Sequence, residues 1–271
     1  VPVYLAAVAY ACVTGFSFVF TKFALEYSTP IPILAHRFLF SFIALVATLA
    51  FRGELSFFKG KTFRNVAPLA LIYPLLFFGF QTFGLQHASS AEGGILLAVA
   101  PVFTLILSHF FLKEKATWLQ AASVLLSVLG VVYIFYNTAK LEEGSGSTSV
   151  LGIVLLLITT LCFSVYSVLG RRYTAKYKNL ELLTVMITIG VIGFHLLAFA
   201  TNPSILYPRE YFAPFKNPKY TLAILYLGVL STLGTSLLTN FILSRLEASK
   251  MSVFANLGTL ISIVAGGVFF N

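Results

Sequence analysis

Aspartate is absent from this chain of 271 residues, and charged residues of all kinds make up only 10% of it. Soluble domains contain about 25% charged residues. With 58% hydrophobic residues and a mean hydropathy of +0.92, the chain carries more apolar surface than a soluble fold of this length could bury. The composition therefore predicts an integral membrane protein.

Several catalytic patterns are missing as well. The lack of aspartate excludes an aspartyl dyad, and we find no HExxH zinc helix, no GxSxG nucleophile elbow and no phosphate-binding P-loop. Cysteine is limited to Cys12 and Cys162, which lie in apolar segments and are interpreted as packing residues rather than a disulfide or metal ligands. We therefore expect no enzyme activity, no cofactor and no metal.

The positive charge of the chain is distributed between its apolar segments. The net charge is +9, but this pattern is typical of signals that orient membrane helices, so we expect a lipid bilayer and no nucleic acid as a partner. With the N-terminus placed in the cytoplasm, the inner loops hold twelve Lys and Arg and the outer loops hold five. Because Lys and Arg accumulate in cytoplasmic loops, the sequence predicts a cytoplasmic N-terminus.

Nine segments are long and apolar enough to cross a bilayer, which requires about 20 residues in a helix. They are Pro2–Lys22, Ile31–Phe51, Val66–Leu85, Ala91–Leu112, Trp118–Tyr136, Val150–Gly170, Leu182–Ala200, Thr221–Leu243 and Ser249–Asn271. The longest connection, Thr201 to Tyr220, contains four prolines and is predicted to be an irregular surface loop, with a lid as the alternative.

The chain also indicates an internal repeat on either side of a Gly/Ser-rich linker, residues 142–149. Residues 1–141 hold five predicted spans and residues 150–271 hold four. Because a unit with an odd number of spans ends on the opposite side of the membrane from its start, its copy must be inverted, as in many secondary transporters. The first unit continues with one turn and one helix where the second unit stops, and we therefore expect a tenth span beyond Asn271.

Two aligned stretches carry the repeat. Leu85–Lys113 aligns with Leu243–Asn271 at an offset of 158 residues, and Ala11–Lys22 aligns with Leu161–Arg172 at an offset of 150. Small residues recur every four positions in the first pair, as Ala100, Thr104 and Ser108 and as Gly258, Ser262 and Gly266. Such stripes allow helix backbones to approach closely in lipid, so we expect both to be packing surfaces.

Three stretches together resemble the drug/metabolite transporter superfamily, in its EamA-like branch. They are "FVFTKFALEYSTPIPILAHRFLFSFIALV", "APVFTLILSHFFLKEKATWLQAASVLLSVLGVVYIF" and "LEASKMSVFANLGTLISIVAGGVFF". The resemblance implies an all-α fold of ten spans in an inverted five-plus-five repeat, of which nine are present here. It also implies a bacterial cytoplasmic (inner) membrane, a central cavity, a possible homodimer and, as typical substrates, amino acids and related metabolites.

Arg37 is the leading candidate for the transport path, because a charge inside a span normally faces protein or a wet cavity. It would either recognise an anion or carboxylate or hold neighbouring helices together, and the structural role is favoured. The other candidates are polar, aromatic or helix-kinking residues inside spans, namely Thr14, Ser17, Tyr73, Gln81, Pro101, Ser164, Tyr166, Asn240 and Asn256. Each could line the path or bond to another helix.

Glu92 and Lys250 occupy matching positions at the starts of the fourth and ninth spans. They are either solvated at a membrane end or act as a gate or proton site. Pro101 and Pro74 are predicted to kink the fourth and third spans, because proline removes a backbone hydrogen bond.

The sequence thus favours a secondary transporter of small organic metabolites that works by alternating access, and export is the expected direction. A carrier of phosphorylated or nucleotide-linked sugars is the alternative, but it would need several cations near the midplane, where we find Arg37 and at most Lys250. An intramembrane enzyme is disfavoured because its motifs are missing.

Overall fold

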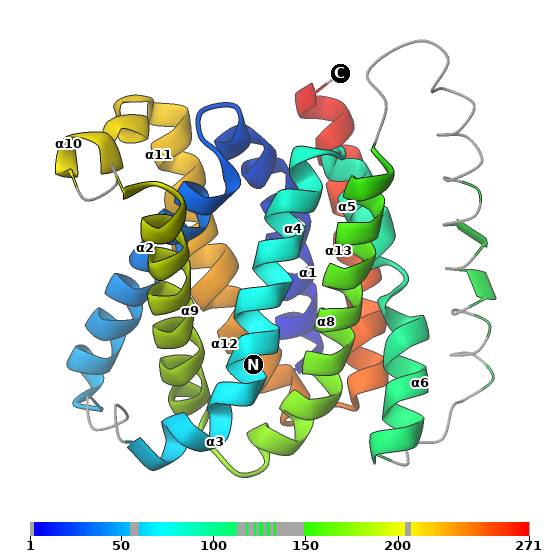
Figure 1. The fold of residues 1–271 in the computed structure, drawn as a ribbon. Coiled ribbons are helices and arrows are strands. Elements are labelled where there is room, and N and C mark those ends of the chain that lie inside the picture. Colours follow the sequence, from blue (N-terminus) through cyan, green and yellow to red (C-terminus); the bar gives the residue numbers. More distant parts are fainter. Residues whose placement is uncertain are drawn as a thin grey trace.

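The computed structural model is a bundle of long helices (Figure 1). It describes residues 3–54, 60–112, 149–203 and 207–270, together with seven isolated positions between 118 and 133, and no strand occurs in these parts. Most of the predicted fifth span, Trp118–Tyr136, and the linker up to residue 148 therefore lie outside the described residues. The bundle is formed by spans of both halves of the chain.

Within the described residues, eight helices or helix groups are long and apolar enough to cross a membrane, so the chain is a multi-pass membrane protein. In the first half they are α1 (Val3–Leu25), α2 (Pro30–Arg52), the group α3 (Gly60–Ala70), η2 (Leu71–Leu76) and α4 (Phe77–Gln86), and the group α5 (Ser90–Leu97) and α6 (Ala100–Leu112). In the second half they are α8 (Val150–Thr174), α9 (Asn179–Thr201), the group α11 (Pro218–Leu225), η5 (Tyr226–Gly234) and α12 (Thr235–Leu243), and α13 (Ala248–Phe270).

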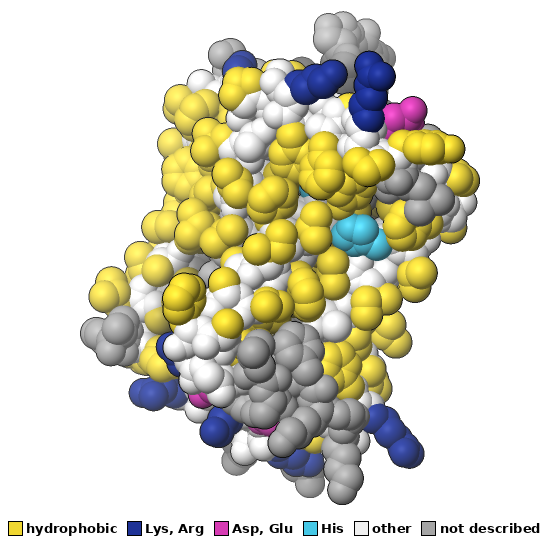
Figure 2. Space-filling view, turned by 90° about the vertical axis from the view of Figure 1, so that its left-hand side faces the viewer, with side chains coloured by type: hydrophobic (Ala, Val, Ile, Leu, Met, Phe, Trp, Pro, Cys, Tyr) yellow, Lys and Arg dark blue, Asp and Glu magenta, His cyan; other side chains and the backbone are white. Residues whose placement is uncertain are grey.

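The surface of the bundle matches a membrane environment. Hydrophobic side chains cover the middle of the face shown in Figure 2, whereas Lys and Arg gather at its two ends. Large apolar residues such as Ile43, Leu196 and Leu222 are each more than half exposed along the spans. Cys162 is buried, as a packing residue should be, but Cys12 is exposed, so the packing role predicted for it is wrong.

The small-residue stripe of α13 packs against spans of the first half. A Cβ atom added to Gly15 of α1 would lie 2.6 Å from the carbonyl oxygen of Gly258, and one added to Gly94 of α5 would lie 2.8 Å from Cβ of Ser262. The hydroxyl of Ser262 donates to the carbonyl oxygen of Ser90 over 2.7 Å. The predicted packing role of this stripe is confirmed.

The stripe of α6 is buried as well. Ala100, Thr104 and Ser108 are all at most 1% exposed. The hydroxyl of Ser164 on α8 donates to the carbonyl oxygen of Ala100 over 3.1 Å, and Thr160 of the same helix donates to Leu96 of α5 over 3.1 Å. This hydroxyl-to-carbonyl bonding ties α8 to α5 and α6, as expected between helices in lipid.

Both proline kinks are confirmed. Tyr73, which precedes Pro74, has non-helical dihedrals (φ −136°, ψ 112°) inside the π-helical segment η2, consistent with the steric restriction of a residue before proline. Ala98 and Val99 interrupt the fourth span between α5 and α6, and Pro101 is the second residue of α6. A second π-helical segment, η5, contains no proline and was not predicted.

The connection between α9 and α11 folds over one end of the bundle as α10 (Pro208–Tyr211) and η4 (Ala213–Lys216). The ring of Tyr211 lies 4.4 Å from that of His36 of α2. Nδ1 of His195 bonds to the carbonyl oxygen of Val191 (2.7 Å), so Nε2 accepts from the Tyr211 hydroxyl (2.8 Å). Burial raises the pKa of Tyr211 to about 12.

Candidate functional site

Arg37 lies on α2 with none of its side chain exposed. Its Nε donates to the hydroxyl oxygen of Thr232 over 2.7 Å, and its Nη2 donates to that of Ser231 over 3.0 Å. The guanidinium carbon stands 3.9 Å from the ring centre of Phe78, within the range of a cation–π contact. The arginine therefore joins α2 to η5 and α4, which fits the structural role favoured for it.

The local geometry of η5 makes these bonds possible. A Cβ atom added to Gly228 would lie 2.8 Å from the carbonyl oxygen of Arg37, so only glycine lets η5 approach the α2 backbone this closely. The hydroxyl of Thr232 donates in turn to the carbonyl oxygen of Leu227, five residues earlier, over 2.7 Å. The side chain that accepts from Arg37 is thereby bonded to the backbone of its own segment.

The charge of Arg37 is not neutralised within the described part of the chain. Its two hydrogen bonds there go to neutral hydroxyls, and its Nη1 atom is buried without a hydrogen-bond partner. A buried positive charge is costly in a membrane and produces a strong local field. The surroundings of Arg37 consequently favour an anionic group.

A cavity of about 20 Å³ lies next to this cluster. It is enclosed by polar and aromatic side chains of both halves of the chain: Tyr10, Thr14, Ser17, Tyr73, Phe77, Phe78, Gln81, Phe163, Ser231 and Thr235. Ser231 and Phe78 separate it from Arg37, which touches both. The volume holds about one water molecule, so the cavity is closed to a metabolite in this conformation.

Four of the predicted path residues, Thr14, Ser17, Tyr73 and Gln81, therefore meet around one cavity. Oε1 of Gln81 is buried and has no hydrogen-bond partner. An unsatisfied acceptor of this kind costs about 1–3 kcal/mol, and a water molecule or a ligand group in the cavity would satisfy it.

Tyr166 and Asn240 form a polar pair behind Tyr73. The hydroxyl of Tyr166 donates to Oδ1 of Asn240 over 2.5 Å, and its ring stacks on that of Tyr73 with centroids 4.2 Å apart. The amide nitrogen of Asn240 is buried without a partner. The pair thus extends the polar region beyond the cavity wall, into the contact between α8 and α12.

The remaining candidates lie elsewhere. Ser164 of α8 bonds to the backbone of α6, Pro101 is buried on α6, and neither lines the cavity. Asn256 is half-buried on α13, with its Oδ1 atom buried and without a partner. These positions remain predictions for the path in another conformation.

Glu92 and Lys250 are both engaged at helix starts. The carboxylate of Glu92 accepts from the backbone N–H of Ser89 (2.7 Å), whose hydroxyl accepts from the N–H of Glu92 (3.1 Å), a capping box for α5. Nζ of Lys250 lies 3.1 Å from a carboxylate oxygen of Glu247 at the exposed start of α13. Neither reaches the cavity.

The sequence alone did not identify Ser231, Thr232 or Thr235. All three lie in the run "STLGT" within one predicted span, at residues 231–235. A cluster of hydroxyls and glycine inside an apolar span was the available signal, but it could not reveal that the partner was Arg37, which lies in the first half of the chain.

Comparison with known proteins places the chain in a family. The EamA-like transporter family matches residues 1–136 and 150–271, so the chain belongs to the EamA-like transporter family, and this membership identifies it as a membrane transporter. It is 41% identical to an uncharacterised transporter, YcxC, of Bacillus subtilis (strain 168) over 270 residues, which cover all of this chain and 86% of the relative.

Two further comparisons cover most of the chain. An S-adenosylmethionine uptake transporter of Rickettsia conorii (strain ATCC VR-613 / Malish 7) is 25% identical over 87% of this chain and 73% of its own length. A protein of known crystal structure is 17% identical and superposes with a TM-score of 0.65 over 99% of this chain and 89% of its own. The second similarity concerns the fold.

Proposed function

We propose that this protein is a secondary transporter that moves small organic metabolites, amino acids or related compounds, out of the cell by alternating access. The observation that carries the proposal is the buried charge of Arg37 beside a polar and aromatic cavity built by both halves of the chain. The positive field of Arg37 would attract a substrate carboxylate that entered an enlarged cavity. The buried Oε1 atom of Gln81, which can only accept a hydrogen bond, would accept one from a substrate ammonium.

The proposal includes an inverted repeat of residues 1–141 and 150–271. Two features support it: α1 and α8, the first spans of the two units, run in opposite directions (Figure 1), and the third span of each unit contains a π-helical segment, η2 or η5. We further propose nine spans, a location in the bacterial inner membrane, a cytoplasmic N-terminus and, from the family resemblance, a homodimer.

Alternating access requires a conformational change from the structure described here. The cavity of about 20 Å³ is more than tenfold smaller than a site for a small organic ligand, which occupies about 300 Å³ or more. The segments η2 and η5 both border it, and backbone without regular α-helical bonding is the natural place for a span to bend. We propose that these two segments are the hinges.

The substrate preference rests on charge. The S-adenosylmethionine uptake transporter is a relative whose name gives an amino-acid derivative as its cargo, and a single buried arginine suits a single carboxylate. Phosphorylated or nucleotide-linked sugars remain the second candidate, but they carry more negative charge than one guanidinium can balance.

Flux into proteoliposomes tests the function. The complete protein is reconstituted and assayed in both directions with the amino acids, S-adenosylmethionine and hexose phosphates. We expect flux of at least one amino acid or derivative and none of the phosphate esters. No flux for any solute contradicts the proposal.

An Arg37→Met variant tests the site. Methionine fills most of the space without a charge, and apolar replacement of buried ionic groups is often tolerated in folding. We therefore expect a folded protein without flux, whereas Lys250→Gln, at the exposed end of α13, should keep normal flux. Normal flux in Arg37→Met would reduce Arg37 to a purely structural residue.

A further inference from the structure

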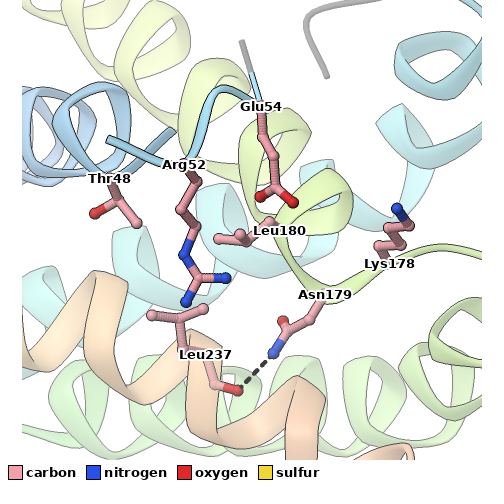
Figure 3. Close-up of a pocket in the computed structure, with 7 residues that line it drawn as sticks. All are labelled: Thr48, Arg52, Glu54, Lys178, Asn179, Leu180 and Leu237. Carbon is pink, nitrogen blue, oxygen red and sulfur yellow. Dashed lines mark hydrogen bonds between the residues drawn. The ribbon is translucent and has the colours of Figure 1, made fainter. Parts of the chain in front are cut away.

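A second, larger cavity of about 340 Å³ opens at the end of the bundle where α2 ends and α9 begins (Figure 3). It lies between α2 of the first half and α9 and α12 of the second. Its lining consists of Thr48, Arg52, Glu54, Lys178, Asn179, Leu180 and Leu237. The loops at this end belong to the side predicted to face the cytoplasm.

Two hydrogen-bond acceptors in this cavity are unsatisfied. Oε2 of Glu54 and Oδ1 of Asn179 are both buried and have no hydrogen-bond partner among the described residues. The orientation of the Asn179 amide is fixed, because its nitrogen donates to the carbonyl oxygen of Leu237 over 2.9 Å. Its oxygen is therefore available to a donor from outside the chain.

A strong donor stands beside these acceptors. Figure 3 shows the guanidinium of Arg52, the carboxylate of Glu54 and the amide of Asn179 turned toward one space, with Lys178 at its edge. No hydrogen bond or ion pair engages the side chain of Arg52 within the part of the chain that the structure describes. Arginine is suited to bind a carboxylate through two parallel hydrogen bonds.

The complementary ligand carries an ammonium for Glu54 and Asn179, a carboxylate for Arg52 and an apolar group for Leu180 and Leu237. We propose that this cavity binds a soluble zwitterion of the α-amino acid class, before it enters the transport path. Its volume of about 340 Å³ lies at the lower end of small-ligand sites. The role of this cavity as an entry site rests on the proposed transport function, whereas the binding of an amino acid to it does not.

An apolar barrier separates this cavity from the one beside Arg37. Leu45 and Leu49 of α2, Leu183 and Ile187 of α9 and Leu233 form one buried cluster. Arg37 and Arg52 are fifteen residues apart on α2, or about 22 Å along the helix axis. The cavity at Arg52 is therefore a separate site, and a solute bound there must pass the leucine cluster to reach Arg37.

Direct binding tests the proposal with the complete protein purified in detergent, using radiolabelled L-leucine as the probe. The leucine methyl ester, which lacks the carboxylate charge, and 4-methylpentanoate, which lacks the ammonium, serve as competitors. We expect unlabelled leucine to compete at least tenfold better than either. Equal competition by all three compounds, or no binding of leucine, overturns the assignment.

Variants locate the site. Arg52→Gln and Glu54→Gln should each weaken leucine binding at least tenfold, and Arg52→Gln should also remove the preference for leucine over its methyl ester. Lys250→Gln and Glu247→Gln change an exposed ion pair at the same end of the bundle and should bind normally. Unchanged binding in the Arg52 and Glu54 variants contradicts the proposal.

Two further arms distinguish this cavity from the Arg37 cavity and from a lipid-binding site. Arg37→Met should retain leucine binding even where it abolishes flux. If the proposed transport function fails, the binding experiment therefore still tests the cavity at Arg52.

The headgroup of phosphatidylethanolamine offers the same ammonium and anion. Leucine binding in nanodiscs of phosphatidylglycerol should persist when phosphatidylethanolamine is added, and its loss would assign the cavity to lipid instead.

Discussion

Helix α2 carries two arginines in opposite situations. Arg37 is fully buried and bonded to Ser231 and Thr232, whereas Arg52 is exposed at an open cavity without a protein partner among the described residues. Removing a charge from water is tolerated when neighbouring dipoles and rings replace the solvent. The buried arginine therefore contributes to the fold in addition to the transport role proposed for it, whereas the exposed one has no such structural role.

Two glutamates repeat the contrast. Glu92 accepts from the backbone of Ser89 and caps α5, whereas Oε2 of Glu54 has no partner. A charge that completes a helix end contributes to stability, whereas a buried carboxylate oxygen without a partner contributes none. Stability measurements on the four residues should therefore divide them into two pairs.

The largest effect is expected for Arg37→Ala. Truncating a large buried side chain usually costs about 2–5 kcal/mol, and the hydroxyls of Ser231 and Thr232 would lose their donor as well. The free energy of unfolding, measured in mixed detergent micelles, checks this. A loss below about 1 kcal/mol, the usual contribution of one hydrogen bond, would show that Arg37 does not hold α2 to η5.

Gly228→Ala tests the close approach that Arg37 depends on. The added methyl group would lie 2.8 Å from the carbonyl oxygen of Arg37, and overpacking of this kind costs about 1–3 kcal/mol. Gly79→Ala is the matched control, since its Cβ would meet nothing within 4 Å. Thermal unfolding of both should show a lower midpoint for Gly228→Ala alone, and equal midpoints would remove the steric argument.

The glutamates should differ by a smaller amount. Loss of capping groups costs about 0.5–2 kcal/mol, so we expect Glu92→Ala to destabilise the protein within that range and Glu54→Ala to leave it nearly unchanged. Glu92→Gln should retain the cap and an unchanged pH dependence of flux. A flattened pH profile in this variant would instead support the proton-site role predicted as an alternative.

The smallest effect on stability is expected for Arg52→Gln. Surface substitutions away from packed or bonded groups usually change the free energy of unfolding by less than about 0.5 kcal/mol. Unfolding curves of this variant and the parent should therefore overlap. A clear loss of stability would show that Arg52 also makes a structural contact, and it would contradict the proposed difference between Arg52 and Arg37.

The spans could be predicted because twenty consecutive apolar residues have few alternatives to a membrane helix. Eight of the nine predicted segments correspond to helices here, and the kink at Pro74 followed from the missing backbone donor of proline. Thr14, Ser17, Tyr73 and Gln81 could be selected as polar or aromatic groups in spans, and they do line one cavity.

The rest depended on distant contacts. Nothing local marks Ser231 and Thr232 as the partners of Arg37, because their role follows from the packing of α2 against η5. The cavity at Arg52 was missed for the same reason: its residues come from three segments, and each looks like an ordinary membrane-end charge or apolar residue. Glu92 was recognised as notable, but its capping box required the backbone geometry of Ser89.

The contact between Gly15 and Gly258 has a mechanical consequence. Because a Cβ atom added to Gly15 would lie only 2.6 Å from the Gly258 carbonyl oxygen, α1 and α13 are in close backbone contact, although they belong to opposite halves of the chain. Two helices in such close contact cannot easily slide past each other, so we expect α1 and α13 to move together as one rigid body during alternating access. The moving parts of this transporter would then be composite blocks, each containing helices from both halves of the chain.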